Sequence, residues 1–313
     1  MSACPPVLLL IFNRPGLTAR VFSAVRAARP SRLYVACDGP RPAKIGEALL
    51  VAQARRVATD VDWPCDVRLR FLDENLGCGE AVSSAITWFL DEAGEGVILE
   101  DDCLPSPAFF SFTSAMLDRY REDERIGVIS GTNLAPEVRL TSDHAFSTLY
   151  SCWGWATWRR TWRRFRLSPP PVGRQEAWAK EIGNRPFKII RRSLERNAKG
   201  AAHTWAYPFL VQQLRDNQLS VIPRHNLVLN IGFDGDGAHF AAGKAPWWVP
   251  RFSYNFNGCW TEEVPIKASP EYDLNNLVSA HGGRGPLMRL WVKFLRRWAN
   301  HRQLTRGDFW DRL

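Results

Sequence analysis

The sequence predicts an α/β fold, with a mostly parallel central sheet flanked by helices. Short apolar runs alternate with segments of helical periodicity from the N-terminus to Ser130, which is the pattern of repeated strand–helix units. Polar residues stand directly after most of these runs. The composition is globular, with 45% apolar and 23% charged residues in a chain of 313, and this excludes wholesale disorder, collagen and coiled coil.

Five short apolar runs are expected to be the strands of the first half: residues 7–12, 33–37, 67–72, 96–99 and 126–130. Helical spacing of apolar side chains marks the segments between them. Leu17, Val21 and Val25 lie on one face of a helix that follows Pro15, and a further helix is expected over residues 46–59. Strands that alternate with helices in this way pair in parallel.

The second half of the sequence is less regular. The elements expected there are a basic helix over residues 187–197, a helix over 207–217, a strand over 220–222 and an apolar run over 227–231. The compact domain is expected to end at about Pro265. The last stretch, residues 286–301, is expected to form a basic amphipathic helix.

The strand ends carry the residues that point to chemistry. Sheets of parallel strands bind ligands beyond the carboxyl ends of their strands. The residues expected there are Arg14, Asp38, Asn75 and an acidic triplet, Glu100, Asp101 and Asp102. Hard carboxylate oxygens suit a Mg²⁺ or Mn²⁺ ion that bridges a nucleotide diphosphate and offsets the charge of the leaving group.

Several function classes lack their motifs in this chain. No G-x-G-x-x-G follows the first strand and no G-x-x-x-x-G-K-[ST] occurs, which disfavours dinucleotide-binding and P-loop proteins. No G-x-S-x-G elbow supports an α/β-hydrolase. The net charge of +9 reflects either a genome rich in Arg codons or an affinity for phosphate, and no RNP, zinc-finger or helix-turn-helix pattern supports a nucleic-acid partner.

The sequence predicts a cytoplasmic protein. No apolar run approaches the roughly 18–20 residues of a membrane span, and the first run lacks the features of a signal peptide. The seven cysteines include no C-x-x-C pair, which argues against a disulfide framework. The helix over 286–301 suits peripheral contact with an anionic membrane at its inner face; the alternative is that its apolar side packs on the domain.

Seven motifs spread over residues 5–260 occur together in one order. They are PVLLLIFNRP (6–15), CDGPR (37–41), NLGCG (75–79), ILEDDC (98–103), SGTN (130–133), YSCWGWATW (150–158) and NIGF (230–233), the last followed by Asp236 and His239. With these motifs the chain resembles a bacterial glycosyltransferase-like family of the nucleotide-diphospho-sugar transferase superfamily. It is similar, more distantly, to family 2 glycosyltransferases and to the eukaryotic protein-O-linked and alpha-mannoside N-acetylglucosaminyltransferases.

The resemblance implies a GT-A fold and transfer of a sugar from a nucleotide-diphosphate sugar, with a UDP-sugar favoured, to a glycan or lipid-linked acceptor. It divides the domain into a nucleotide-sugar half (1–135) and an acceptor half (136–262), followed by an extension (263–313). It also implies a divalent cation, Mn²⁺ or Mg²⁺, held by the DxD-like triplet, with Asp102 as the direct ligand and His239 as a candidate second ligand.

Further roles come from the same resemblance. Asp38 would hydrogen-bond the base, while Arg14 and the Asn75 loop would line the nucleotide together with Glu100 and Asp101. The aromatic residues expected at the acceptor pocket are Trp153, Trp155 and Trp205.

One departure from the family concerns the catalytic base. Relatives tend to carry Thr-Trp-Asp where this chain has Thr204-Trp205-Ala206, and alanine cannot accept the acceptor's proton. Three alternatives follow: another carboxylate, Asp234 or Asp236, serves as the base; the reaction is retaining and the leaving phosphate acts as base; or the chain binds a nucleotide sugar and turns it over poorly.

Overall fold

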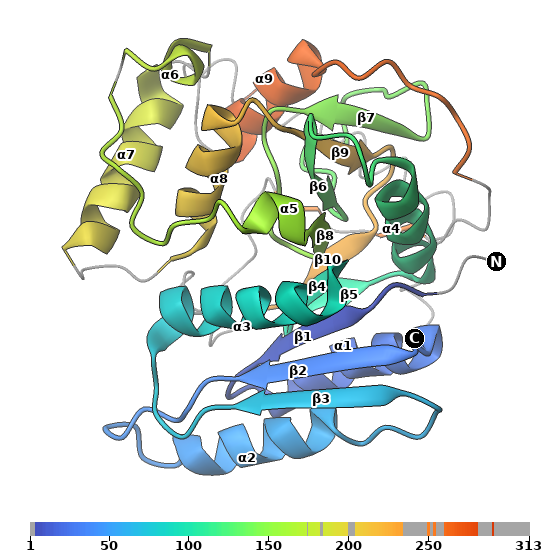
Figure 1. Ribbon diagram of the computed structural model, residues 1–313, viewed down its shortest axis with the longest axis vertical. Coiled ribbons are helices and arrows are strands. Elements are labelled where there is room, and N and C mark those ends of the chain that lie inside the picture. The colour runs from blue at the N-terminus through green and yellow to red at the C-terminus, as the bar shows by residue number, and fades with distance from the viewer. Residues whose placement is uncertain are drawn as a thin grey trace.

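The computed structural model describes residues 4–173, 175–181, 184–199, 204–233, 249–250, 253–254, 260–280 and 290. These residues form an α/β fold around an eight-stranded sheet with the strand order β3-β2-β1-β4-β8-β6-β9-β7 (Figure 1). Helices cover both faces of the sheet. The expected α/β class with a large central sheet is therefore confirmed.

The elements of the first half lie where the apolar runs predict them, except that β5 and α4 are not predicted. They are β1 (Val7–Ile11), α1 (Pro15–Ala28), β2 (Arg32–Cys37), α2 (Glu47–Ala58), β3 (Asp66–Phe71), α3 (Gly77–Ala93), β4 (Glu95–Glu100), β5 (Cys103–Pro105), α4 (Pro107–Arg119) and β6 (Ile126–Ser130). All five residues of β1 are buried, which is why a central parallel strand reads as a continuous apolar run.

The second half contains strands that the sequence does not predict. Its elements are β7 (His144–Ser147), β8 (Trp155–Trp158), α5 (Arg159–Trp162), α6 (Ala177–Glu181), α7 (Asn184–Ala198), α8 (Ala206–Arg215), β9 (Leu219–Pro223), β10 (Val228–Asn230) and α9 (Pro270–Ala280). The expected basic helix corresponds to α7, the expected helix over 207–217 to α8 and the strand over 220–222 to β9.

The sheet is parallel in its first half and mixed in its second. β1 pairs in parallel with β2 and β4, and β3 continues the parallel order from β2. β8 then runs antiparallel to both β4 and β6, β9 is parallel to β6, and β7 is antiparallel to β9. The expectation of a mostly parallel sheet holds for the strands that precede the acidic triplet. Because the long connection from β6 to β8 contains no crossover helix, β8 is free to enter antiparallel.

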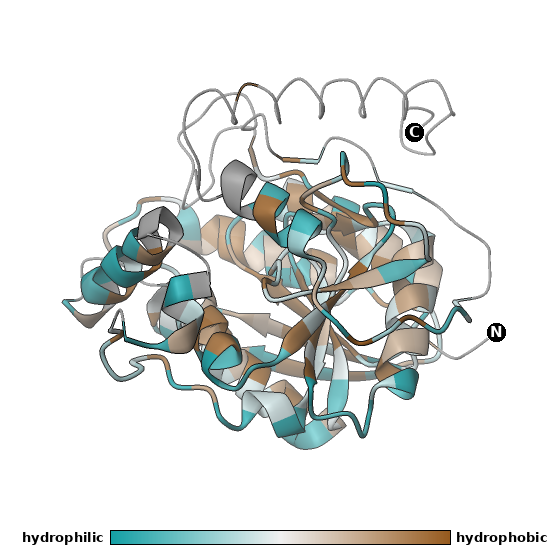
Figure 2. Ribbon diagram, turned by 90° about the horizontal axis from the view of Figure 1, so that it is seen from above, coloured by the Kyte–Doolittle hydropathy of each residue, from teal (hydrophilic) through white to brown (hydrophobic). Residues whose placement is uncertain are grey.

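Two hydrophobic layers, one on each face of the sheet, hold the fold together. Alternate residues of β1 point to opposite faces: Leu9 packs with α1, α2 and α4, whereas Leu8 and Leu10 pack with α3 and α8. Each fully buried aliphatic side chain of this kind contributes roughly 1.5–3 kcal/mol. In Figure 2 the apolar colour gathers in the central strands and the hydrophilic colour lies on the outer sides of the helices.

Gly154 brings the start of β8 close to its neighbours. Its φ of 64° lies in the left-handed region, and a Cβ atom there would stand 2.7 Å from a Val228 methyl group. Its carbonyl oxygen accepts a hydrogen bond of 2.8 Å from the Gly131 amide. Both the backbone conformation and the available space therefore require glycine at this position.

Three predicted site residues and the predicted amphipathic helix cannot be placed. Asp234, Asp236, His239 and most of the 286–301 stretch lie outside the described residues. Among the helices that are described, none has the length and apolar character that crossing a membrane requires.

Replacing Gly154 with alanine is expected to lower the free energy of unfolding by about 2–4 kcal/mol, since the change adds backbone strain to a steric overlap. Urea denaturation measures the loss. Gly94→Ala is the matched control, because Gly94 has a φ of 81° and nothing within 4 Å of its Cβ position. Equal losses in the two variants would show that the contact with Val228 carries no weight.

Candidate functional site

The acidic triplet lies at the carboxyl edge of the parallel strands, as the sequence predicts. Leu10 pairs with Glu100 and Ile11 pairs with Cys37, so the residues that follow β1, β2 and β4 leave the sheet side by side. The Phe12 amide donates a hydrogen bond to Asp101 Oδ2 at 3.3 Å, which fixes that carboxylate against the end of β1.

Arg14 joins both aspartates of the triplet. One guanidinium nitrogen donates to Asp102 Oδ2 at 3.0 Å, and the other forms an ion pair with Asp101. Pro15 occupies the first position of α1, where its fixed φ suits a helix start, and so sets the turn that presents Arg14. The structure therefore brings Arg14, Asp101 and Asp102 into one cluster, in which Asp101 is buried and the other two are half-buried.

Burial and mutual repulsion govern the charge state of the triplet. Burial, then the charges of Asp102 and Asp101, raises the pKa of Glu100 to about 8. Burial also raises the pKa of Asp101, to about 6, against the opposing effect of Arg14. Carboxylates placed this close together favour the approach of a further cation, which would lower their pKa values again.

The NIGF motif of the second half lies directly on Asp102. The Ile231 amide donates to the Asp102 backbone oxygen at 2.8 Å. A Cβ atom on Gly232 would stand 2.4 Å from Asp102 Oδ2, so only glycine allows this approach. Phe233 then meets Trp153 edge to face, with ring centroids 6.0 Å apart. These two motifs from the second half of the chain thus border the acidic cluster.

Asp38 joins the ends of β2 and β3 to the start of α3. Its carboxylate accepts four hydrogen bonds of 2.9–3.0 Å, from the amides of Gly39, Leu76 and Gly77 and from Asn75 Nδ2. No side chain within α3 caps that helix, so Asp38 supplies an acceptor for its first amides from another part of the chain. The structure therefore brings Asp38 and Asn75 together, and the two side chains hydrogen-bond to each other.

Glu47 contacts residues that follow β1 and β2, and sequence reasoning missed it. It accepts a hydrogen bond from Asn13 Nδ2 at 2.9 Å and from the Arg41 amide at 2.7 Å, and it forms an ion pair with the Arg41 side chain. The side-chain hydrogen bond from Arg41 lowers the pKa of Glu47 to about 2. In the sequence, a glutamate in the first turn of a helix is explained by its favourable interaction with the helix dipole. No sequence signal indicates that Glu47 also binds Asn13 and Arg41.

The three predicted acceptor tryptophans lie in different surroundings. Trp155 and Trp205 are 0% and 3% exposed, and their rings stack on each other with centroids 5.5 Å apart. Both belong to the core layer beneath α3 and α8, so neither ring offers a face to a ligand. Trp153 is half-buried beside Phe233 and is the tryptophan of the three that borders the acidic cluster.

Ala206 is connected to the acidic cluster through Tyr150. The Tyr150 hydroxyl donates to the Ala206 backbone oxygen at 2.7 Å. Burial, then the neighbouring Cys152 and Glu100, raises the pKa of that hydroxyl. Ala206 is the first residue of α8 and is half-buried. Ala206 is therefore linked to Glu100 through the Tyr150 hydroxyl, without a direct contact that the structure records.

The donor set suits a cation that is shared with a diphosphate. Among the residues that the structure describes, no three His, Cys, Asp or Glu side chains form a metal cage. Mg²⁺ is commonly bound by one or two protein carboxylates together with substrate phosphates, and it does not need an all-protein cage. Asp102, whose side chain is 14% exposed, and Glu100 are the carboxylates that could serve in this way.

Comparison with known proteins adds no assignment. The chain matches no protein-family model, and no curated protein sequence matches it. The resemblance in motifs therefore stays a prediction.

Asp38→Asn is expected to lower the free energy of unfolding by about 2–4 kcal/mol, because an amide group would place its own donors against two of the four donors that the carboxylate accepts. Chemical denaturation measures the change. Asp73→Asn, an exposed residue in the adjacent loop, is the control and is expected to stay within about 0.5 kcal/mol. A similar small effect for Asp38→Asn would contradict the capping role.

Proposed function

We propose that the chain is a metal-dependent glycosyltransferase with a GT-A fold, which transfers a sugar from a nucleotide-diphosphate sugar to a glycan or lipid-linked acceptor. One observation carries the proposal: an arginine and three carboxylates meet at the carboxyl edge of the parallel strands, under a segment from the other half of the chain. An edge with both charges suits a diphosphate and the cation that accompanies it.

The residues divide the work by their surroundings. Asp102 and Glu100 would hold Mn²⁺ or Mg²⁺, which supplies charge neutralisation at the diphosphate leaving group. Arg14 would bind a phosphate oxygen, since a guanidinium pairs with phosphate as it does with carboxylate. Asp101 is 2% exposed and bound to Arg14 and Phe12, so it orients Arg14. A UDP-sugar is the favoured donor.

Recognition of the base would depend on the rim of the site. In this proposal the loop that starts at Gly39 and the loop 75–77 surround the base, and Asp38 holds the two loops together. Phe12 adds an aromatic ring, with the Arg41 guanidinium 5.5 Å from its centroid. The acceptor would approach from the side of Trp153 and Phe233. We place the protein in the cytoplasm, with its acceptor at the inner face of the membrane when that acceptor is lipid-linked.

The second candidate function is a nucleotide-sugar-binding protein that turns its ligand over poorly. Ala206 favours it, because this position begins the helix to which the Tyr150 hydroxyl is bonded and carries no group that accepts a proton. Asp234 or Asp236, which follow Phe233 in the sequence, are the carboxylates proposed to replace it if the chain is active.

Asp102→Asn is expected to abolish Mn²⁺-dependent binding of nucleotide sugars while the fold stays intact, because the change removes a carboxylate charge at the cation site. A thermal-shift panel of UDP-, GDP-, dTDP- and CMP-sugars with Mn²⁺ tests it; a ligand at 100 times its Kd stabilises the native protein by about 2.7 kcal/mol. Asp118→Asn, whose side chain is 79% exposed, is the control. Unchanged affinity in Asp102→Asn would overturn the metal assignment.

Ala206→Asp separates the two candidate functions. An aspartate is well tolerated in the first turn of a helix, and here it would be the residue whose backbone oxygen binds Tyr150. If the missing base limits turnover, the variant should release nucleotide from its donor at least tenfold faster than the parent, with donor affinity unchanged. The control is Ala206→Asn, which has the same shape without the basic carboxylate. If Ala206→Asp gains no activity, the missing base does not limit turnover. If Asp236→Asn also keeps the parent rate, Asp236 is not the replacement base, and both accounts fail.

A further inference from the structure

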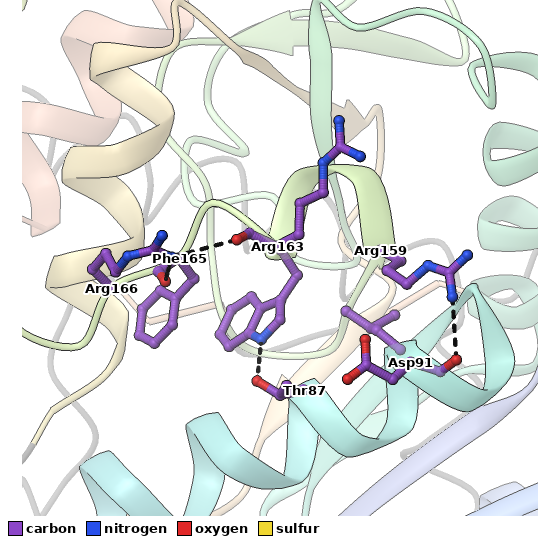
Figure 3. Close-up of a pocket in the computed structure, with 8 residues that line it drawn as sticks. Thr87, Asp91, Arg159, Arg163, Phe165 and Arg166 are labelled. Carbon is purple, nitrogen blue, oxygen red and sulfur yellow. Dashed lines mark hydrogen bonds between the residues drawn. The ribbon is translucent and has the colours of Figure 1, made fainter.

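A cavity of about 190 Å³ lies away from the acidic cluster, between α3 and the arginine-rich segment that begins with α5. Thr87, Leu90 and Asp91 line it from α3 (Figure 3). These residues lie ten to fourteen positions after Gly77, so the cavity is roughly 15–20 Å along the helix from the end that Asp38 caps. The cavity is therefore separate from the proposed donor site.

The floor of the cavity is apolar and rigid. Trp162 and Phe165 stack with ring centroids 4.3 Å apart and planes within 11° of parallel. The indole nitrogen of Trp162 donates to Thr87 Oγ1 at 2.9 Å (Figure 3), and Thr87 in turn donates to the Ser83 backbone oxygen at 3.0 Å. The polar atoms of this floor are satisfied, so the floor itself offers a ligand only contact surface.

The rim carries an excess of positive charge. Arg159, Arg163 and Arg166 line the cavity and all are exposed, against the single carboxylate of Asp91. Within the described part of the chain, none of these three arginines forms an ion pair with an acidic side chain. Nearby Arg164 differs, because it lies 3.7 Å from Asp216.

The three arginines are not equivalent. Arg159 closes the end of α3: its amide donates to the Gly94 oxygen at 2.7 Å and its side chain reaches the Asp91 backbone oxygen at 3.3 Å. These two contacts to backbone oxygens give Arg159 a structural role at the end of α3. Arg166 donates only to backbone oxygens of its own loop, and the guanidinium of Arg163 stands apart from the labelled groups (Figure 3). Two cations on exposed, flexible side chains therefore remain at the rim.

We propose that this cavity binds a phosphate group, with Arg163 and Arg166 as its ligands and Arg159 holding the end of α3 in place. Guanidinium groups bind phosphate through paired hydrogen bonds, and the apolar floor strengthens that attraction by excluding water from one side. The cavity is smaller than the roughly 300–1,000 Å³ of sites that bury drug-sized ligands, so it suits one phosphate group and excludes a whole nucleotide sugar.

Isothermal titration calorimetry of the full chain with inorganic phosphate at low ionic strength tests the proposal. Sedimentation with phosphatidylcholine vesicles, with and without phosphatidylglycerol, tests whether the phosphate group belongs to a lipid headgroup. The double variant Arg163→Gln/Arg166→Gln is expected to weaken binding at least tenfold. Because both side chains are exposed, the variant should keep the parent circular dichroism and melting temperature. Arg163→Lys in place of the double change should give an intermediate loss, since an ammonium group pairs with phosphate at a single point.

Arg164→Gln is the matched control, because it removes the same charge from the same segment at an arginine that already has carboxylate neighbours. The proposal is supported if Arg164→Gln still binds phosphate or anionic vesicles and the double variant does not. An equal loss in both variants would show attraction to overall charge and overturn the proposal. Unchanged phosphate binding in the double variant would also overturn the proposal, since it would place the phosphate elsewhere. The absence of binding of either probe to the parent protein would overturn it as well.

Discussion

The pairing of Arg14 with two aspartates is the interaction on which the rest of the candidate site depends. Asp101 is 2% exposed, and a carboxylate buried to this extent without a partner destabilises a protein by about 3–5 kcal/mol. Arg14 supplies the partner from the turn after β1, and the Phe12 amide adds a hydrogen bond. The ends of β1 and β4 are thereby joined. Among the described residues Glu100 forms no ion pair, and Arg14 offsets only part of the repulsion between Glu100 and its two neighbours. In the proposed function, stability and affinity for a cation therefore have one origin.

Glycine makes the meeting of the two halves possible at this edge. Gly232 passes so close to Asp102 that no side chain fits between them, and Gly154 turns β8 into the sheet beside β4. β8 then connects the parallel strands to β6, β9 and β7. The two halves of the chain therefore share one sheet, and their loops meet at the acidic cluster.

The sequence predicts the parallel half well because strands buried on both faces leave continuous apolar runs, and their polar ends mark the rim. It predicts less where chemistry depends on packing. The strand Trp155–Trp158 shows neither an apolar run nor a clear alternation, so it is missed. Trp155 and Trp205 resemble exposed sugar platforms in sequence, yet they stack in the core, because residue type does not tell which face of an aromatic ring is covered. Glu47 acts through residues distant in the sequence, which no local motif records.

Asp38 lies at the end of β2, as the sequence predicts, and its carboxylate is occupied by groups of the protein itself. A carboxylate has about four lone-pair sites, and the amides of Gly39, Leu76 and Gly77 together with Asn75 supply four donors. Little acceptor capacity is left for a base. In the proposed function, specificity for the base therefore belongs to the backbone of the loops that Asp38 holds, and to Phe12. Asp38 acts through the position of those loops, in the same way that Asp101 acts through Arg14.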